Sequence, residues 1–218
     1  MPHALPDIRR LLFTSVLSDC LDSAGLMDQA LPAHIRPLDE ASVMAGRART
    51  AQFMEVDHHE TGSNPYELEI ALIDSLAADE IPVFACSNPA RIAPWGELLS
   101  TAAQVRGGRG AVVDGLVRDI RKIEALNFPV FAAGIKPLDS QGRGIVVDYN
   151  VPVECGEVLV NPGDLIFADE DGVIVVPSAV VPQVVELATN KVARENGTRD
   201  ELLKGGYLRD AFKKYGVL

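Results

Sequence analysis

The chain has 218 residues, 47% hydrophobic and 23% charged, which is enough apolar material for a folded core and excludes a disordered chain. Its formal net charge is -11 and its basic residues are scattered, so it lacks the basic stripe with which proteins displace counterions from nucleic acid. No apolar run approaches the roughly 18 residues that span a bilayer, and we expect neither a nucleic-acid nor a membrane partner.

The N-terminal third predicts a long helix, a strand and a second helix. Apolar residues recur with helical spacing from 7 to 25, and Gly25 is placed to end this helix. Residues 46–54 alternate loosely and predict a strand. A polar, turn-rich loop over 58–65 then leads into a helix over 66–78 with one apolar face. The predicted members of that face are Leu68, Leu72 and Leu76.

From residue 81 the chain alternates strands and helices. The expected elements are a strand over 81–86, a helix over 96–105, a strand over 110–113, a helix over 119–126 and a strand over 129–133. We expect the third of these elements to end in a turn at Asp114 and Gly115. Strands separated by short helices predict parallel pairing through crossover connections, and therefore an α/β fold.

After residue 144 the pattern changes to short β-branched runs separated by turns. The expected strands cover 145–149, 158–160, 165–168 and 173–176. They predict an antiparallel meander or a small barrel-like unit. Residues 178–218 predict a helical extension with helices over 180–195 and 200–214. No linker-like stretch interrupts the chain, so we expect a single domain over 1–218.

The segment that follows Trp95 is a candidate anion site. It opens a helix at Gly96, and the first-turn amides of a helix lack intrahelical acceptors and carry partial positive charge. The amides of Gly96, Glu97, Leu98 and Leu99 could therefore bind a substrate carboxylate. The same pattern also fits a plain helix start with Gly96 as its cap, and the pattern alone favours that interpretation.

The segment over 107–119 is a candidate cation and 2-oxo acid site. Arg118 offers a planar, permanently charged fork for a carboxylate or 2-oxo group. Asp119 offers a hard oxygen ligand for Mg²⁺ or Mn²⁺. In the alternative interpretation, which an isolated Arg-Asp pair favours, Asp119 caps a helix and Arg118 pairs with a surface acid. The preceding glycines fit neither a dinucleotide fingerprint nor a P-loop.

Cysteines, histidines and the N-terminus carry no functional signal. The three cysteines form no CxxC pair, and we expect them to be small buried hydrophobes; they are Cys20, Cys86 and Cys155. His58 and His59 are adjacent and cannot form a zinc-binding pair on one helix face. No secretory signal pattern is visible, so we expect a cytoplasmic protein.

Several short motifs occur together at spacings that are far more specific than any one of them. They are Ser18-Asp19-Cys20-Leu21-Asp22 with Gly25, the run 95–99, the run 110–119, the run 128–131, Asn161-Pro162-Gly163-Asp164 and the run 168–173. This combination resembles the family of RraA-like proteins and 4-hydroxy-4-methyl-2-oxoglutarate aldolases over most of the chain. The resemblance implies a compact, swivelling-domain-like αββα sandwich with a small β-barrel-like core and C-terminal helices. It also implies a ring-shaped homotrimer, sometimes doubled to a hexamer, with sites between subunits.

The resemblance also implies roles for the candidate residues. In aldolases of this family, a divalent metal is held by the aspartate that matches Asp119, with water at most other positions. The arginine that matches Arg118 contacts the pyruvyl unit, and the amides of 96–99 bind its carboxylate. An acid at the position of Glu97 orders metal-bound water; the family often has aspartate there, which is shorter by one methylene.

The implied function is a Mg²⁺- or Mn²⁺-dependent lyase that releases pyruvate from a small 2-oxo acid by retro-aldol cleavage or decarboxylation. Substrates of this kind are 4-hydroxy-4-methyl-2-oxoglutarate and oxaloacetate. A glutamate from a neighbouring subunit's C-terminal region also contributes, matched here by Glu195 and secondly by Glu201. The catalytic residues we predict are therefore Arg118, Glu97 and Glu195. The alternative is a non-catalytic RraA-like regulator of ribonuclease activity that acts by protein–protein binding.

Overall fold

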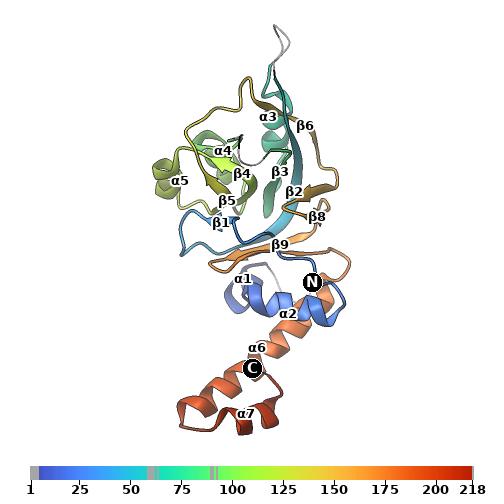
Figure 1. Ribbon diagram of the computed structural model, residues 1–218, viewed down its shortest axis with the longest axis vertical. Helices are drawn as coiled ribbons and strands as arrows, with labels where there is room; N and C mark the ends of the chain where they lie inside the picture. The colour runs from blue at the N-terminus through green and yellow to red at the C-terminus, as the bar shows by residue number, and fades with distance from the viewer. Residues whose placement is uncertain (1–4, 58–61, 63, 89–90, 92, 218) are drawn as a thin grey trace.

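A mixed eight-stranded sheet organises the computed structural model, which describes residues 5–57, 62, 64–88, 91 and 93–217 (Figure 1). The strands follow the order β1-β5-β4-β3-β2-β9-β10, and β6 also pairs with β2. Their bounds are β1 (Arg36–Pro37), β2 (Met44–Glu55), β3 (Glu80–Cys86), β4 (Ala111–Val117), β5 (Val130–Ile135), β6 (Gly144–Tyr149), β9 (Leu165–Asp169) and β10 (Gly172–Val176).

Strands β2, β3, β4 and β5 are parallel, as the sequence predicts. The crossovers contain α3 (Glu67–Asp74), α4 (Glu97–Val105) and α5 (Ile120–Leu126). Because each crossover helix follows a parallel strand, the loops that leave β3 and β4 emerge at the same edge of the sheet. This arrangement brings the segment before α4 close to the segment before α5.

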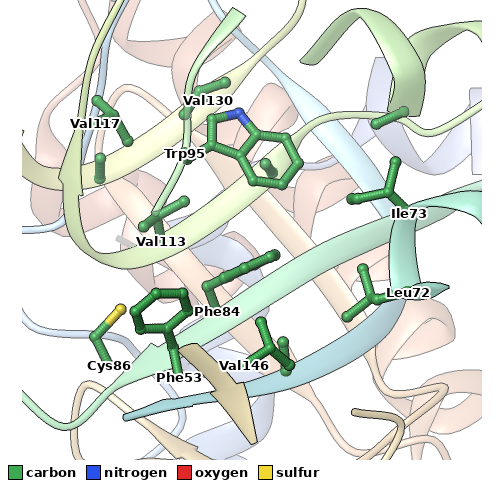
Figure 2. Close-up of a cluster of buried hydrophobic side chains, with 14 of the residues drawn as sticks. Phe53, Leu72, Ile73, Phe84, Cys86, Trp95, Val113, Val117, Val130 and Val146 are labelled. Carbon is green, nitrogen blue, oxygen red and sulfur yellow. The ribbon is translucent and has the colours of Figure 1, made fainter. Parts of the chain in front are cut away.

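Both faces of the parallel strands are buried. On one face, Phe84 and Trp95 pack edge to face with ring centroids 5.4 Å apart, against Leu72 and Ile73 of α3 (Figure 2). The other face is covered by a separate hairpin of β7 (Val153–Cys155) and β8 (Val158–Val160). This double covering accounts for the nearly continuous apolar runs of β3 and β4.

The sheet curls into a nearly closed, barrel-like shape (Figure 1). Strand β2 is long enough to pair with β9 through its first residues and with β6 through its last ones. The chain over 30–37 links the two ends of the sheet, since Ala30 bridges to Ile174 of β10 and Arg36 pairs with β5. The predicted antiparallel meander after residue 144 is therefore correct for β9 and β10, which pair antiparallel. It is wrong for β6, which joins β2 and not its neighbours in sequence.

The predicted helix over 7–25 is interrupted. The structure has α1 (Leu5–Leu11) and α2 (Thr14–Ser23), with Phe13 in an extended conformation between them. The backbone N–H and hydroxyl of Thr14 donate hydrogen bonds of 2.8 and 2.6 Å to the buried carboxylate of Asp169. Satisfying that buried acid outweighs the helical bonds that continuity would have added.

The C-terminal helices also differ from the prediction. Helix α6 (Val181–Leu203) runs without a break through Gly197, where two helices were expected, and α7 (Leu208–Tyr215) folds back on it. A Cβ at Gly197 would lie 2.7 Å from the Tyr215 ring, so this glycine serves helix packing and not a turn. The start of α6 packs on α2, whereas its second half and α7 extend away from the sheet (Figure 1).

Strand β4 does not end at Asp114-Gly115 as predicted. It continues to Val117 through a register shift against β5, and buried Asp114 accepts a hydrogen bond of 2.9 Å from the Gly156 N–H. The cysteines are all buried and unpaired, as expected. Within the described ranges, none of the helices has the length and apolarity needed to cross a bilayer. The predicted loop histidines, His58 and His59, lie outside the described residues.

Candidate active site

The two candidate segments lie side by side. Trp95 forms an isolated parallel bridge with Val117, and the Arg118 N–H donates a hydrogen bond of 3.0 Å to the Trp95 carbonyl. The indole N–H of buried Trp95 is in turn satisfied by the Ser100 hydroxyl at 2.8 Å. These contacts hold the start of α4 against the end of β4, and Arg118 and Asp119 follow directly after that strand.

Gly96 is required by close approach and not by an unusual backbone conformation. Its backbone is extended, with φ of -158°. A Cβ there would lie 2.9 Å from Asp119 Oδ2 and 3.3 Å from Arg118 Cγ. A side chain at position 96 would therefore displace both predicted site residues, which explains glycine at this helix start.

Asp119 occupies the N-cap position of α5 in the left-handed region, with φ of 64° and ψ of 30°. This conformation is costly for a residue other than glycine and is found where the surrounding structure imposes it. The carboxylate makes no capping hydrogen bond within α5; instead Oδ2 accepts a long bond of 3.4 Å from the Glu97 N–H. The interpretation of Asp119 as a simple helix cap is therefore wrong.

A cavity of about 390 Å³ lies where these segments meet. All the residues predicted to bind substrate or metal on this side of the fold line it: Gly96, Glu97, Leu98, Leu99, Arg118 and Asp119. Its lining also includes Tyr66, Glu69 and Asp139. The structure therefore brings together two sequence segments that were proposed separately.

Arg118 is held between two carboxylates. Its Nε lies 3.9 Å from Asp119 Oδ2, and its Nη1 lies 3.7 Å from Asp139 Oδ2. Asp139 also accepts a hydrogen bond of 3.0 Å from the Tyr66 hydroxyl. Burial would raise the pKa of Asp139, but bonds from the Gln141 N–H and Tyr66 and the charge of Arg118 lower it overall. The alternative prediction that Arg118 pairs with a surface acid is therefore partly correct, because both carboxylates are partly exposed, but both also line the cavity.

Glu97 is anchored at the first turn of α4. Its Oε1 accepts a hydrogen bond of 3.0 Å from the Thr101 hydroxyl, and its Oε2 lies 3.9 Å from Lys122 Nζ of α5. Its carboxylate therefore bridges the two helices that carry the candidate segments. The Leu98 side chain is largely exposed, so residue 98 has only its backbone amide to offer a bound anion.

A family model described as RraA-like (Aldolase/RraA) matches residues 14–175. The chain belongs to the RraA-like family. A protein of Halalkalibacterium halodurans named "Putative 4-hydroxy-4-methyl-2-oxoglutarate aldolase" is 37% identical over 198 residues, which cover 89% of this chain and 88% of that protein. "Uncharacterized protein MJ0644" of Methanocaldococcus jannaschii is 42% identical over 119 residues, covering 54% of this chain and 56% of that protein.

The fold is shared with solved structures of the RraA-like family. The structure of Streptomyces coelicolor RraAS2, described as an unusual member of the RNase ES inhibitor RraA protein family, has a TM-score of 0.80 to this chain. The two are 28% identical, and the match covers 90% of this chain and 96% of the other. The family and fold predicted from the motifs are confirmed.

The C-terminal glutamates do not line the RraA-like cavity within one chain. Glu195 lies on α6 beside a second depression, between α2 and the C-terminal helices, which Asp19 and Thr198 also line. Glu201 accepts a hydrogen bond of 2.8 Å from Lys214 of α7. Because the predicted role of Glu195 or Glu201 is in a neighbouring subunit's site, it stays a prediction.

Three ionisable residues of the cavity escaped the sequence analysis: Tyr66, Glu69 and Asp139. Glu69 is buried on α3, at 4% exposure, whereas the predicted face residue Leu68 is 37% exposed. Glu69 precedes Leu72 and Ile73 by three and four positions, so helical spacing could have placed it on the buried face. Asp139 follows β5 in an irregular segment and carries no such signal.

The cavity's donor set fits a hard divalent cation held by few protein ligands. Asp119 presents a partly exposed carboxylate to the cavity, and oxygen is the donor that Mg²⁺ and Mn²⁺ prefer. No group of three His, Cys, Asp or Glu side chains suited to a metal converges anywhere in the described part of the chain. A cation at Asp119 would take its remaining ligands from water or substrate, as Mg²⁺ often does.

Proposed function

We propose that this RraA-like chain is a divalent-metal-dependent carbon–carbon lyase that releases pyruvate from a small 2-oxo acid. The observation that carries the proposal is the single cavity in which Arg118, Asp119 and the first turn of α4 meet. The name of the Halalkalibacterium halodurans relative supports the aldolase reaction. We propose 4-hydroxy-4-methyl-2-oxoglutarate and oxaloacetate as substrates to test.

Cleavage of the C3–C4 bond leaves an electron pair on the pyruvyl fragment, and the site must stabilise the negative charge that develops. Mg²⁺ or Mn²⁺ at Asp119 would supply a Lewis acid for the charge that develops on the 2-keto oxygen. Arg118 would add a fixed positive charge beside that oxygen, already oriented by Asp139. The amides of Leu98 and Leu99, which lack intrahelical acceptors, would bind the substrate carboxylate. In the retro-aldol reaction, Glu97 would accept the proton of the C4 hydroxyl; oxaloacetate carries a carboxylate there and needs no such step.

The assembly that completes the site is also a proposal. We propose a cytoplasmic homotrimer or hexamer in which Glu195 reaches the cavity of a neighbouring subunit. In support, the second half of α6 extends from the body of the chain (Figure 1). Several large apolar side chains are exposed on this extension: Leu202, Leu203, Tyr207, Leu208 and Phe212. A subunit contact would remove them from water.

A ribonuclease regulator is the second candidate, because the RraAS2 structure is described within an RNase inhibitor family. Regulation by protein contact does not require the arrangement of Arg118, Asp119 and Gly96 around a cavity. That arrangement favours the lyase.

The proposed function is tested by pyruvate release from oxaloacetate and from 4-hydroxy-4-methyl-2-oxoglutarate, each with Mg²⁺ and with EDTA. We expect turnover that EDTA abolishes and Mg²⁺ restores. Asp119→Ala should abolish turnover while the thermal unfolding transition stays cooperative. Arg118→Lys should lower kcat/KM at least about 100-fold, because an ammonium cannot replace the planar fork. Arg121→Lys, an exposed position on α5, is the matched control; wild-type turnover in EDTA would refute the metal.

A further inference from the structure

Glu69 is a buried acid that faces the proposed reaction cavity. It is 4% exposed, and its side chain lines the cavity together with Arg118 and Asp139. Among the described residues, no donor lies within hydrogen-bonding distance of its carboxyl group, and Glu69 shares the buried face of α3 with Leu72 and Ile73. A buried carboxyl group without donors is stable in its neutral form, which keeps a proton that the cavity can use.

The surroundings of Glu69 and Asp139 shift the pKa values of these two acids in opposite directions. Asp139 is kept ionised by Tyr66, the Gln141 N–H and Arg118. Burial, and then the negative charge of Asp139, raise the pKa of Glu69 to about 8, although Arg118 opposes the shift. Burial raises the pKa of Cys86, at the end of β3, so its thiol stays protonated. Two carboxyl groups in one cavity are thus held in opposite protonation states, as acid–base pairs in active sites often are.

We propose that Glu69 is the acid that protonates C3 of the enolate left by carbon–carbon cleavage, and so forms the methyl group of pyruvate. This inference rests on the proposed function. When the C3–C4 bond breaks, its electron pair becomes the C2–C3 double bond and the 2-keto oxygen gains negative charge. The Glu69 O–H then gives its proton to C3, the keto group re-forms, and Glu69 is left as a carboxylate. It recovers a proton from solvent, and no oxidant or reductant is required.

The other ionisable side chains of the cavity are less suited to this step. Asp139 is ionised and has no proton to give. The guanidinium of Arg118 does not lose its proton in proteins. Burial and then the hydrogen bond to Asp139 raise the pKa of Tyr66 to about 12, and its O–H already donates to that acid. Glu97 and Asp119 have other proposed roles, in accepting the hydroxyl proton and holding the cation.

The experiment follows the reverse of this step in pyruvate alone. In D₂O with Mg²⁺, the wild-type protein should exchange the methyl protons of pyruvate, and proton NMR measures the rate. Glu69→Gln should lower the exchange rate at least about 100-fold, the usual effect of removing a general acid–base group. Pyruvate affinity, measured by calorimetry, should change less than about 3-fold, because glutamine fills the same space as the neutral acid.

Glu67→Gln, an exposed acid on the same helix, is the matched control and should exchange at the wild-type rate. The pH profile adds a readout that a structural role would not produce. Since exchange begins with Glu69 as the base, the wild-type rate should rise with pH up to about 8 and then level. Glu69→Asp, which keeps the carboxyl group but retracts it, should restore part of the exchange if Glu69→Gln folds poorly.

The outcomes separate this inference from the proposed function. A wild-type protein that releases pyruvate from oxaloacetate, with unchanged exchange in Glu69→Gln, overturns the role of Glu69 and leaves the lyase intact. A wild-type protein that neither exchanges pyruvate protons nor releases pyruvate overturns the lyase, and the role of Glu69 with it. Loss of exchange in Glu69→Gln with continued oxaloacetate consumption supports the proposal, because bond cleavage precedes protonation.

Discussion

Arg118 and Asp139, which both line the cavity, form an ion pair with 3.7 Å between Nη1 and Oδ2. Asp139 is itself held by the Tyr66 hydroxyl, so the guanidinium is oriented by a group that is fixed in turn. A long arginine side chain loses less entropy on binding substrate when it is already held in place. The ion pair therefore holds Arg118 at the cavity without neutralising it through a tight, bidentate contact.

Asp139→Asn should release this restraint. We expect kcat/KM for the 2-oxo acid to fall about 10- to 100-fold, since a misplaced charge loses most of its effect on the transition state. The substitution also removes a negative charge that raises the pKa of Glu69, so the pH profile of pyruvate exchange should shift to lower pH. Asp148→Asn, at an exposed position on β6, is the control. An unchanged kcat/KM and an unshifted profile would show that Asp139 does not position Arg118.

Gly96→Ala tests the close approach at the start of α4. The extended backbone of Gly96 accepts alanine, so folding should be retained and Tm should change by only a few degrees. The added Cβ would lie 2.9 Å from Asp119 Oδ2, and the carboxylate must move. We therefore expect Mg²⁺ affinity, measured by titration of activity, to fall at least about 10-fold. Leu98→Ala is the control, because it keeps the backbone amide and removes an exposed side chain.

The local motifs predicted the segments that form the site. Other features of the fold depend on contacts between residues far apart in the sequence and were not predicted. Gly96, Arg118 and Asp119 lie at element boundaries, where the local pattern alone favoured a plain helix start and a helix cap, and the resemblance to the RraA-like family assigned them to the site. The break between α1 and α2 was not predicted, because it depends on Thr14 binding Asp169 155 residues away. Asp139 was missed for the same reason, since only the folded chain places it beside Arg118.

Glu69 is the one missed residue that helical spacing in the sequence could have identified. The apolar pattern of α3 suggested Leu68 as a face residue, whereas the fold turns Glu69 inward with Leu72 and Ile73. An acid in phase with two buried apolar residues is uncommon enough to signal function. The catalytic and metal-binding roles assigned to the predicted residues remain predictions, because geometry places them together without testing their chemistry.

Glu69 should make the stability of the protein depend on pH. Its pKa is about 8 in the folded protein and near the ordinary glutamate value of ~4.3 when unfolded. Between these values the native state binds a proton that the unfolded state has lost, so the free energy of unfolding falls as pH rises. The stability is fully present below the unfolded value and is lost as pH rises through about 8.

Glu69→Gln should remove this dependence, because an amide remains neutral. In urea unfolding at fixed protein concentration, the free energy of unfolding of the variant should rise relative to that of the wild type. The difference should grow by up to about 1.4 kcal/mol for each unit of increasing pH within the window. At pH 5 the two proteins should differ least, and at pH 9 the variant should be the more stable. Glu67→Gln should follow the wild type throughout. Parallel pH curves for wild type and Glu69→Gln would mean that Glu69 is ionised in the folded protein.

Glu195 offers a test of sites shared between subunits. Arg118 lies at the cavity and Glu195 on the extension formed by the C-terminal helices, so one chain alone does not unite them. Arg118→Lys and Glu195→Gln should each be nearly inactive as pure assemblies. In a 1:1 co-expressed mixture, a site contains both groups when a subunit that keeps Arg118 has a neighbour that keeps Glu195. Random assembly places up to about a quarter of the sites in this arrangement. Pyruvate release by the purified mixture measures this recovery, and Glu201→Gln in place of Glu195→Gln tests the second candidate. If neither mixture exceeds its parent variants, the two groups do not meet across a subunit boundary.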